Sequence, residues 1–302
     1  MAAIELANVT KRYDDVAALK TLDLTVERGE IYGFLGPNGA GKSTTINLLL
    51  DFIRPTAGTV TVLGHDAQAE SLAVRQQTGV LPEGFSMYNR LTGRKHVEFA
   101  IESKEASDDP DALLRRVGLE GEGDRKAGGY SKGMRQRLAL AMAIAGSPEL
   151  LILDEPSTGL DPNGAREMRR IITEERDRGA TVFFSSHILE QVEAICDRVG
   201  ILRKGELVAE DTLSALRDET GAGTTLVITV AALPDGALDA VRSLPGVLDV
   251  SHEDDTVTVA CEDGTKTRVL TTLEDNGATV TDFSTKEASL EDLFASYTEV
   301  SA

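Results

Sequence analysis

The sequence has few cysteines, few basic side chains and no long apolar segment. Cys196 and Cys261 lie far apart, outside any CxxC or Cys/His spacing, so the 302 residues indicate no disulfide framework or cysteine metal site. Cys196 falls in an apolar helical pattern, which is typical of a small core residue. The N-terminus lacks the apolar run of a signal peptide, and no uncharged stretch is long enough to span a bilayer. We therefore expect a soluble cytosolic chain that needs a partner for any work at a membrane.

Basic side chains are scarce, since 31 Lys and Arg stand against 50 Asp and Glu, a formal net charge of −19. This balance argues against a protein that coats nucleic acid or docks on anionic lipid, because both contacts depend on Lys and Arg. Only 10 basic residues are Lys. That composition fits a salt-rich cell interior, where counterions screen dense negative charge, and it equally fits an ordinary acidic cytosolic protein.

Charge divides the chain into two predicted domains, residues 1–218 and 219–302. The first carries 34 acidic and 27 basic residues, a net charge of −7, and the second carries 16 acidic and 4 basic residues, a net charge of −12. Residues 219–224 are polar and Gly-rich, as is typical of a linker. The apolar content of 41% is sufficient for buried cores.

The first region is predicted to be an α/β domain. Short, nearly continuous apolar runs alternate with helical patterns, which predicts a mostly parallel sheet covered by helices. Period-two segments between residues 4 and 62 predict a flanking antiparallel sheet, and residues 91–119 predict a helical subdomain. The expected buried strands are 31–35, 150–153 and 181–184, and the helices that follow them are 43–52, 163–178 and 188–197.

The second region is predicted to be a small α+β accessory domain. Its elements follow the order β-α-β-β-α-β, which is the order of a ferredoxin-like fold, and a last helix comes after them. No residue pattern there indicates chemistry. The expected strands are 225–231, 247–250, 256–260 and 279–283, and the expected helices are 237–243, 266–276 and 289–297.

The strongest chemical signal is the segment GPNGAGKST at residues 36–44, which follows an apolar strand and opens a helix. Its glycines let the backbone curl around phosphate, and the helix N-terminus adds partial positive charge. Lys42 supplies a point charge for the β- and γ-phosphates, and the Ser43 hydroxyl is a ligand for Mg²⁺. The parallel sheet is therefore of the phosphate-loop nucleoside triphosphatase type. The predicted nucleotide-binding residues are Asn38, Gly39, Gly41, Lys42, Ser43 and Thr44.

A second signal is the segment LLILDEP at residues 150–156, a predicted strand that ends in two carboxylates. Asp154 is placed to join the magnesium shell. Glu155 is placed to orient or deprotonate a water aimed at the γ-phosphate. Two acids at a strand end would by themselves suggest a solvated surface, but together with the phosphate loop they predict a catalytic site.

In this order the motifs resemble those of the ATP-binding subunits of ABC transporters, over about residues 4–218. Residues 130–137, YSKGMRQR, resemble the family signature LSGGQ, with Ser131 and Gly133 in place. A Ser N-cap with free N–H groups at a helix start is itself an anion site. The segment STGLDP at 157–162 resembles the loop whose aspartate, Asp161 here, crosses between two subunits.

The resemblance implies roles for three further residues. Tyr13 matches the aromatic residue that stacks on adenine, and His187 matches the switch histidine that contacts the γ-phosphate. Glu83 stands where many members have a Gln that touches Mg²⁺ and the attacking water. It is either a metal or water ligand, a contact for the membrane partner, or a surface acid. Residues 287–294, EASLEDLF, resemble the tail of multi-component exporter ATPases, including drug, ion and polysaccharide exporters.

The sequence thus predicts an ATPase with ATP and Mg²⁺ as cofactors that powers a separate polytopic permease, an exporter, at the cytoplasmic face of the cell membrane. The resemblance implies that two copies, or this chain and a sister ATPase, pair head to tail with each ATP between Lys42 of one and Ser131 and Gly133 of the other. The alternative is a soluble ABC-type ATPase acting on ribosomes or DNA. One nucleotide domain, no heptad run and an acidic surface weigh against it, so no nucleic-acid partner is expected. A small-molecule kinase would leave the signature and the histidine unexplained.

Overall fold

The computed structural model describes residues 2–186, 189–219, 224–234, 236–262 and 264–286. The chain forms two compact units, Met1–Glu210 and Asp211–Ala302, and each is described here by itself. The boundary predicted between residues 218 and 219 lies at the end of helix α8 (Leu213–Glu219) and stays a prediction. Across the described ranges, no helix has both the length and the apolarity that crossing a membrane requires.

The first unit contains a four-stranded antiparallel sheet in the order β2-β1-β4-β5. Alternate residues of β1 and β2 are buried, as the period-two pattern predicts for a sheet that covers a core with one face. In β1, Ile4 pairs with Val62 of β4 and with Val26 of β2. The strands are β1 (Ala2–Tyr13), β2 (Val16–Glu27), β4 (Ala57–Val62) and β5 (His65–Asp66).

Beside it lies a six-stranded sheet in the order β10-β9-β3-β8-β7-β6, and its pairs from β9 to β6 are parallel. Strands β3, β7 and β8 are buried along their whole length, which explains their continuous apolar sequences. Because parallel strands end at the same edge, the residues that follow β3 and β7 meet there, beside the end of β8. The strands are β3 (Ile31–Leu35), β6 (Thr78–Leu81), β7 (Leu150–Asp154), β8 (Thr181–Ser186), β9 (Arg198–Arg203) and β10 (Glu206–Asp211).

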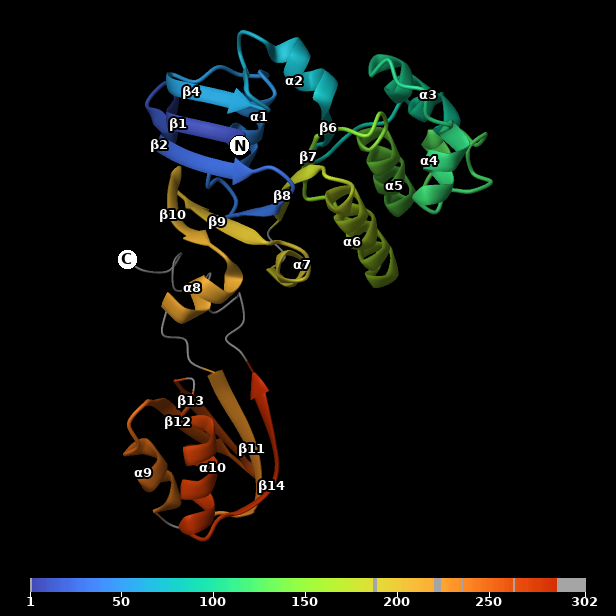
Figure 1. The fold of residues 1–302 in the computed structure, drawn as a ribbon. Coiled ribbons are helices and arrows are strands. Elements are labelled where there is room, and N and C mark those ends of the chain that lie inside the picture. The colour runs from blue at the N-terminus through green and yellow to red at the C-terminus, as the bar shows by residue number, and fades with distance from the viewer. Residues whose placement is uncertain (1, 187–188, 220–223, 235, 263, 287–302) are drawn as a thin grey trace. The chain divides into compact units, whose positions relative to one another are not determined.

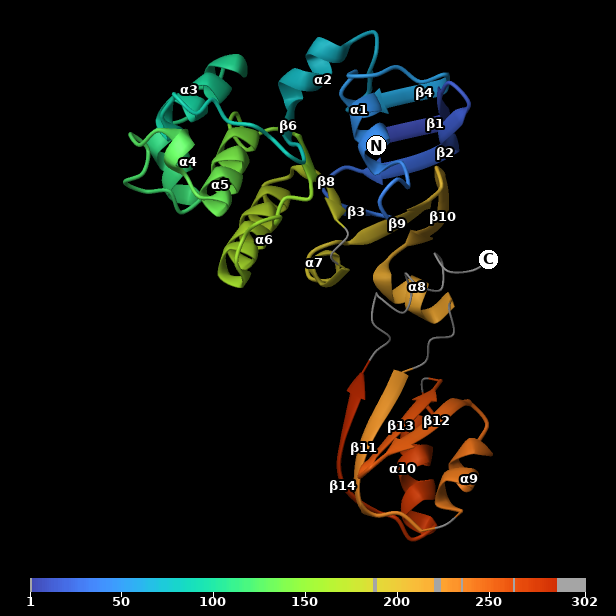
Figure 2. The same cartoon turned by 180° about the vertical axis from the view of Figure 1, so that it is seen from behind.

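Helices α3, α4 and α5 pack together, and we call this group the helical layer. It lies beside α6, and Figures 1 and 2 show it from opposite sides. Side-chain caps begin these helices, because the hydroxyl or carboxylate of Thr92, Asp109, Ser131 and Asp161 accepts a hydrogen bond from an N–H of the first turn. The helices are α1 (Lys42–Leu49), α2 (Ser71–Gln77), α3 (Gly93–Ser103), α4 (Pro110–Arg116), α5 (Lys132–Ala143), α6 (Pro162–Asp177) and α7 (Leu189–Glu193), and η1 (Ala127–Gly129) is a 3₁₀ turn.

The helix predicted at 188–197 is shorter in the described residues, where α7 ends at Glu193. The reason is tertiary. The Asp197 N–H donates to the Ile31 carbonyl at 2.8 Å, and the Asp197 carboxylate accepts from the Ile31 N–H at 2.8 Å. These bonds draw the chain toward β3. Cys196 is a free thiol of intermediate exposure, so it borders the core rather than lying fully within it, and desolvation raises its pKa.

The second unit is an antiparallel sheet in the order β12-β13-β11-β14 with helices α9 and α10. This is the strand order of a ferredoxin-like fold, so the predicted α+β class is confirmed. The predicted last helix, 289–297, lies outside the described residues. The elements are α8 at the start, then β11 (Thr224–Ala232), α9 (Ala237–Arg242), β12 (Val247–Glu253), β13 (Thr256–Cys261), α10 (Lys266–Asp275) and β14 (Thr279–Lys286).

Candidate nucleotide site

The loop at residues 36–44 joins the end of β3 to the start of α1. It needs glycine at Gly41, whose φ is 119° and whose added Cβ would lie 2.8 Å from the Ala18 carbonyl oxygen. Gly41 is also the N-cap of α1, so no side chain caps the first N–H groups of this helix. Those groups and the positive end of the helix dipole are therefore directed at the loop, as phosphate binding requires.

A backbone carbonyl of the loop holds the side chain of Lys42 against it. That side chain is only 9% exposed, and Nζ donates to the Gly36 carbonyl at 2.6 Å. A buried ammonium group needs acceptors to offset lost hydration. The loop carbonyl supplies one and keeps the charge beside the N–H groups that would surround a phosphate.

Asp154 and Glu155 lie at the end of β7, each 6% exposed. Hydroxyls from the next strand hold both carboxylates: Ser185 Oγ donates to Asp154, and Ser186 Oγ donates to Glu155 Oε2 at 3.5 Å. Glu155 has a φ of 49°, in the left-handed region that a side chain rarely adopts. Backbone strain of this kind costs about 1–3 kcal/mol.

The loop and the two acids line one cavity of about 240 Å³. It combines an ammonium group, a helix N-terminus, hydroxyls and carboxylates, so it suits an anionic ligand accompanied by a hard cation. Its lining residues are Ala18, Pro37, Asn38, Gly39, Gly41, Lys42, Ser43, Thr44, Glu83, Asp154 and Glu155.

The donors in this cavity fit Mg²⁺. Within the described residues no cluster of three His, Cys, Asp or Glu side chains forms a self-sufficient metal site. Mg²⁺ is usually held by one or two carboxylates together with phosphate oxygens and water, rather than by an all-protein cage. Asp154, Glu83 and the Ser43 hydroxyl provide the oxygens of that kind.

Ser131, Gly133 and Asp161 line a different cavity, of about 470 Å³, at the start of α5 and α6. Ser131 Oγ accepts the Met134 N–H at 3.1 Å, and the Asp161 carboxylate accepts the Gly164 N–H at 2.8 Å. The stem of Lys132 lies over Gly159, where an added Cβ would meet it at 2.4 Å. The structure therefore brings these three predicted residues together, but away from the phosphate loop of the same chain.

Among the described residues, predicted Tyr13 lines neither of these two cavities. Tyr13 lies at the end of β1 and is 46% exposed, and Lys11 Nζ lies 4.9 Å from the centroid of its ring. His187 lies outside the described residues. Sequence reasoning missed Gln136 of α5, whose side chain donates to the Pro156 carbonyl at 2.7 Å and ties the signature helix to the turn after Glu155. The local sequence gives no signal for this role, because Gln136 stands between two other polar residues, Arg135 and Arg137.

An apolar groove of about 260 Å³ lies between α3, α5 and the loop after β6. Three of its phenylalanines are largely exposed, Phe52 at 61%, Phe85 at 42% and Phe99 at 62%. Lys104 closes one end, with Nζ donating to the Thr78 carbonyl at 2.6 Å, and burial lowers its pKa. Such a cluster of exposed aromatic side chains is a candidate interaction surface.

A buried parallel sheet whose strand ends carry a glycine loop, a lysine and paired acids defines a phosphate-loop nucleoside triphosphatase. A family model for ABC transporters matches residues 19–158, and one for the C-terminal domain of DrrA1-3-like ATP-binding proteins matches residues 212–298.

Curated relatives and solved structures agree with these matches. The linearmycin resistance ATP-binding protein LnrL of Bacillus subtilis is 34% identical over 83% of this chain and 82% of its own length. The bacitracin transport ATP-binding protein BcrA of Enterococcus faecalis is 33% identical over 97% of this chain and 95% of its own length. A solved ATP-binding subunit of an ABC transporter superposes with a TM-score of 0.69 at 31% identity, covering 72% of this chain and 93% of that one. A dimeric ATP-binding cassette in a post-hydrolysis state with ADP and Pi gives a TM-score of 0.64 at 26% identity, covering 70% of this chain and 98% of that one.

The chain belongs to the ATP-binding proteins of ABC transporters, and it is an ATP-hydrolysing enzyme of that family. The resemblance in the sequence is thereby confirmed, as is the α/β fold of the first unit.

Proposed function

We propose that this chain hydrolyses Mg-ATP to power a separate polytopic permease that exports a small molecule, and that it acts at the cytoplasmic face of the cell membrane. The observation that carries the proposal is the single cavity in which Lys42 and Ser43 face Asp154 and Glu155. The relatives named for linearmycin resistance and bacitracin transport support the exporter assignment.

The residues of that cavity have complementary tasks in the proposed reaction. Lys42 and the N–H groups of the loop bind the β- and γ-phosphates. Ser43, Asp154 and Glu83 would hold Mg²⁺, which would supply positive charge to offset that of the phosphates. Glu155 accepts a proton from the attacking water. Its strained backbone and the Ser186 hydroxyl fix the carboxylate in one direction.

A second copy, or a sister ATPase, completes the site. The cavity lined by Ser131, Gly133 and Asp161 is separate from the phosphate loop of the same chain, so it is free to receive a nucleotide bound to another chain. The solved dimeric cassette among the structural relatives supports this arrangement. ATP then joins two chains, and hydrolysis favours their separation.

The permease docks on the apolar groove beside Phe52, Phe85 and Phe99 in this proposal. The groove adjoins the loop that carries Glu83, because Pro82 lines the groove and Glu83 lines the nucleotide cavity. Movement at the phosphates is thereby linked to the docking surface through two consecutive residues.

The test of the proposal is Glu155→Gln. The variant is expected to bind ATP, to hydrolyse it about 10²–10⁴-fold more slowly because the general base is gone, and to accumulate as an ATP-bound dimer. Phosphate release and light scattering measure the two effects, and hydrolysis at the native rate would refute the role of Glu155. Capture of the chain from detergent-solubilised membranes should recover a polytopic partner; recovery with ribosomes or DNA instead would favour the soluble ATPase.

A further inference from the structure

Glu175 is a buried carboxylate that the nucleotide site does not use. It lies in the last turn of α6 with no exposed surface. Burial disfavours its charge, and so does the negative end of the helix dipole. A carboxylate in this position persists only where cations compensate it.

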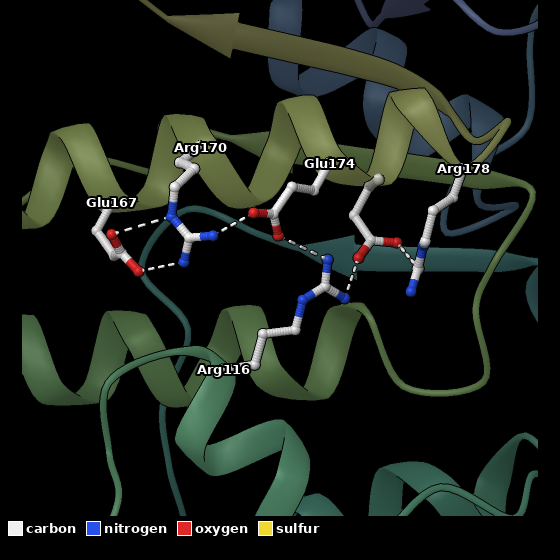
Figure 3. A network of polar contacts seen from close by, with 6 residues as sticks. Arg116, Glu167, Arg170, Glu174 and Arg178 are labelled. Atoms are coloured by element: carbon white, nitrogen blue, oxygen red, sulfur yellow. Dashed lines mark hydrogen bonds and ion pairs between the residues drawn. The ribbon is translucent and has the colours of Figure 1, made fainter.

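Two arginines provide that compensation. Arg178 contacts Glu175 from one turn further along the same chain segment, and Arg116 reaches it from α4 in the helical layer. Arg116 also contacts Glu174 Oε2 at 3.3 Å, as Figure 3 shows. Within the described residues Glu175 Oε1 has no hydrogen bond, so the charge of Arg116, in ion-pair contact with it, is what offsets the burial of that oxygen.

The Arg116–Glu175 ion pair links the two groups of helices whose N-termini line the cavity of Ser131 and Asp161. Arg116 belongs to α4, which packs on α3 and α5, and α5 begins beside Ser131. Glu175 belongs to α6, which begins beside Asp161. The ion pair therefore spans from the helical layer to α6 at the end of α6 remote from the cavity. A buried charge pair has a defined geometry, whereas apolar packing is non-directional.

We propose that Arg116 and Glu175 are positioning residues that fix the orientation of the helical layer on α6, so that the Ser131 cavity is preformed for the nucleotide of a second copy. The inference rests on the proposed function. Preorganisation lowers the ordering cost of association. Losing the pair should weaken ATP-dependent pairing of two chains while leaving the binding of nucleotide to one chain unchanged.

The experiment uses the full chain in the Glu155→Gln background and follows dimer formation by light scattering as ATP is raised. Arg116→Met and Glu175→Gln are each expected to raise the ATP concentration for half-maximal dimer at least tenfold. Binding of a fluorescent ATP analogue to the dilute single chain should stay within twofold. Arg178→Met is the matched control, because it removes a cation from the same carboxylate without crossing to α4, and its dimerisation should stay within twofold.

A double variant separates positioning from stability. Arg116→Met with Glu175→Leu replaces the buried pair by apolar contact, which often restores stability, so the melting temperature should recover while dimerisation stays weak. The inference is overturned if Arg116→Met dimerises like its parent, or if dimerisation returns together with the melting temperature. If the Glu155→Gln parent itself never dimerises with ATP, the proposed function has failed rather than this inference alone.

Discussion

The two units of this chain place polar groups in opposite ways. In the described part of the first unit, Lys42, Asp154, Glu155 and Glu175 are all charged and all buried. In the described part of the second unit, the buried polar or charged residue is Thr265, and the rest of the core is apolar. Buried charge has a high desolvation cost, so the first unit holds its charges only with dedicated partners such as Ser185 and Arg116.

Left-handed backbone does not follow the same division. In the first unit nine described non-glycine residues have a positive φ, and among them only Glu155 lines the candidate nucleotide cavity; the others are Asn8, Asp14, Thr21, Asp51, Leu63, Glu105, Ser147 and Lys204. In the second unit the left-handed non-glycine residue of the described chain is Asp254, in the turn between β12 and β13. A turn residue of that kind serves chain reversal. The difference between the units therefore lies in buried charge, which gathers at the candidate site of the first unit, whereas the second unit is organised by packing.

The largest expected effect is the loss of nucleotide affinity when Lys42, a buried cation of the first unit, is replaced. Lys42→Ala removes about two charge-assisted hydrogen bonds to phosphate, each worth ~1.5–3 kcal/mol, so nucleotide affinity should fall by about 10²–10⁴-fold. Titration with a fluorescent nucleotide measures the loss. Lys95→Ala, which removes an exposed lysine of α3, is the control and should bind like the native chain; equal losses in both variants would point to a general effect of charge.

A core substitution in the second unit tests whether it is organised by packing alone. Leu273 of α10 is fully buried in that unit's apolar cluster. Leu273→Ala should cost ~2–5 kcal/mol of unfolding free energy, and Leu273→Met, which conserves volume, should cost less than about 1.5 kcal/mol. Urea unfolding measures both. ATP hydrolysis should be unchanged below the transition, and a parallel loss of hydrolysis would show that the second unit supports the site.

The sequence predicted the fold class of both units, but several short elements of the first unit were not expected. The phosphate loop and the acidic strand end were found because each needs particular residue types at fixed local spacing, and both line one cavity. Helix α2 and strands β6, β9 and β10 were not expected. They are short segments whose sequence periodicity is weak, and pairing with neighbouring strands decides them.

Long-range contacts had no local signal at all. Arg116 and Glu175 are ordinary charged residues of amphipathic helices when each is seen in its own segment, and only the tertiary fold buries Glu175 and brings the partly exposed Arg116 to it. The hydroxyls of Ser185 and Ser186 also look like the polar end of a strand until β8 is placed beside β7. Such contacts depend on register between distant segments, which a single sequence does not contain.

The strain at Glu155 offers a smaller and more specific test. Both Glu155→Ala and Glu155→Gly remove the carboxylate and should be equally inactive in hydrolysis. Glycine accepts a φ of 49° without a Cβ clash, so Glu155→Gly should be more stable than Glu155→Ala by about 1 kcal/mol. Thermal unfolding compares the two. Equal stability would show that the backbone at Glu155 is not strained.

Added salt should have the smallest effect of the changes considered, and it should stabilise the second unit more than the first. Residues 219–302 carry a net charge of −12 against −7 for the much longer 1–218, and their described ion pairs, such as Arg242–Asp239 at 2.9 Å, are exposed. Raising salt from about 0.1 M to 1 M shortens the screening length from ~10 Å to ~3 Å, which relieves repulsion among the acids. We expect the second unit to gain up to about 1 kcal/mol and the first unit less. Calorimetry with added sodium chloride measures the shift, and sucrose, which stabilises by exclusion rather than screening, is the control. If salt shifts both units equally, or as much as sucrose does, the acidity of the second unit has no part in what distinguishes it from the first.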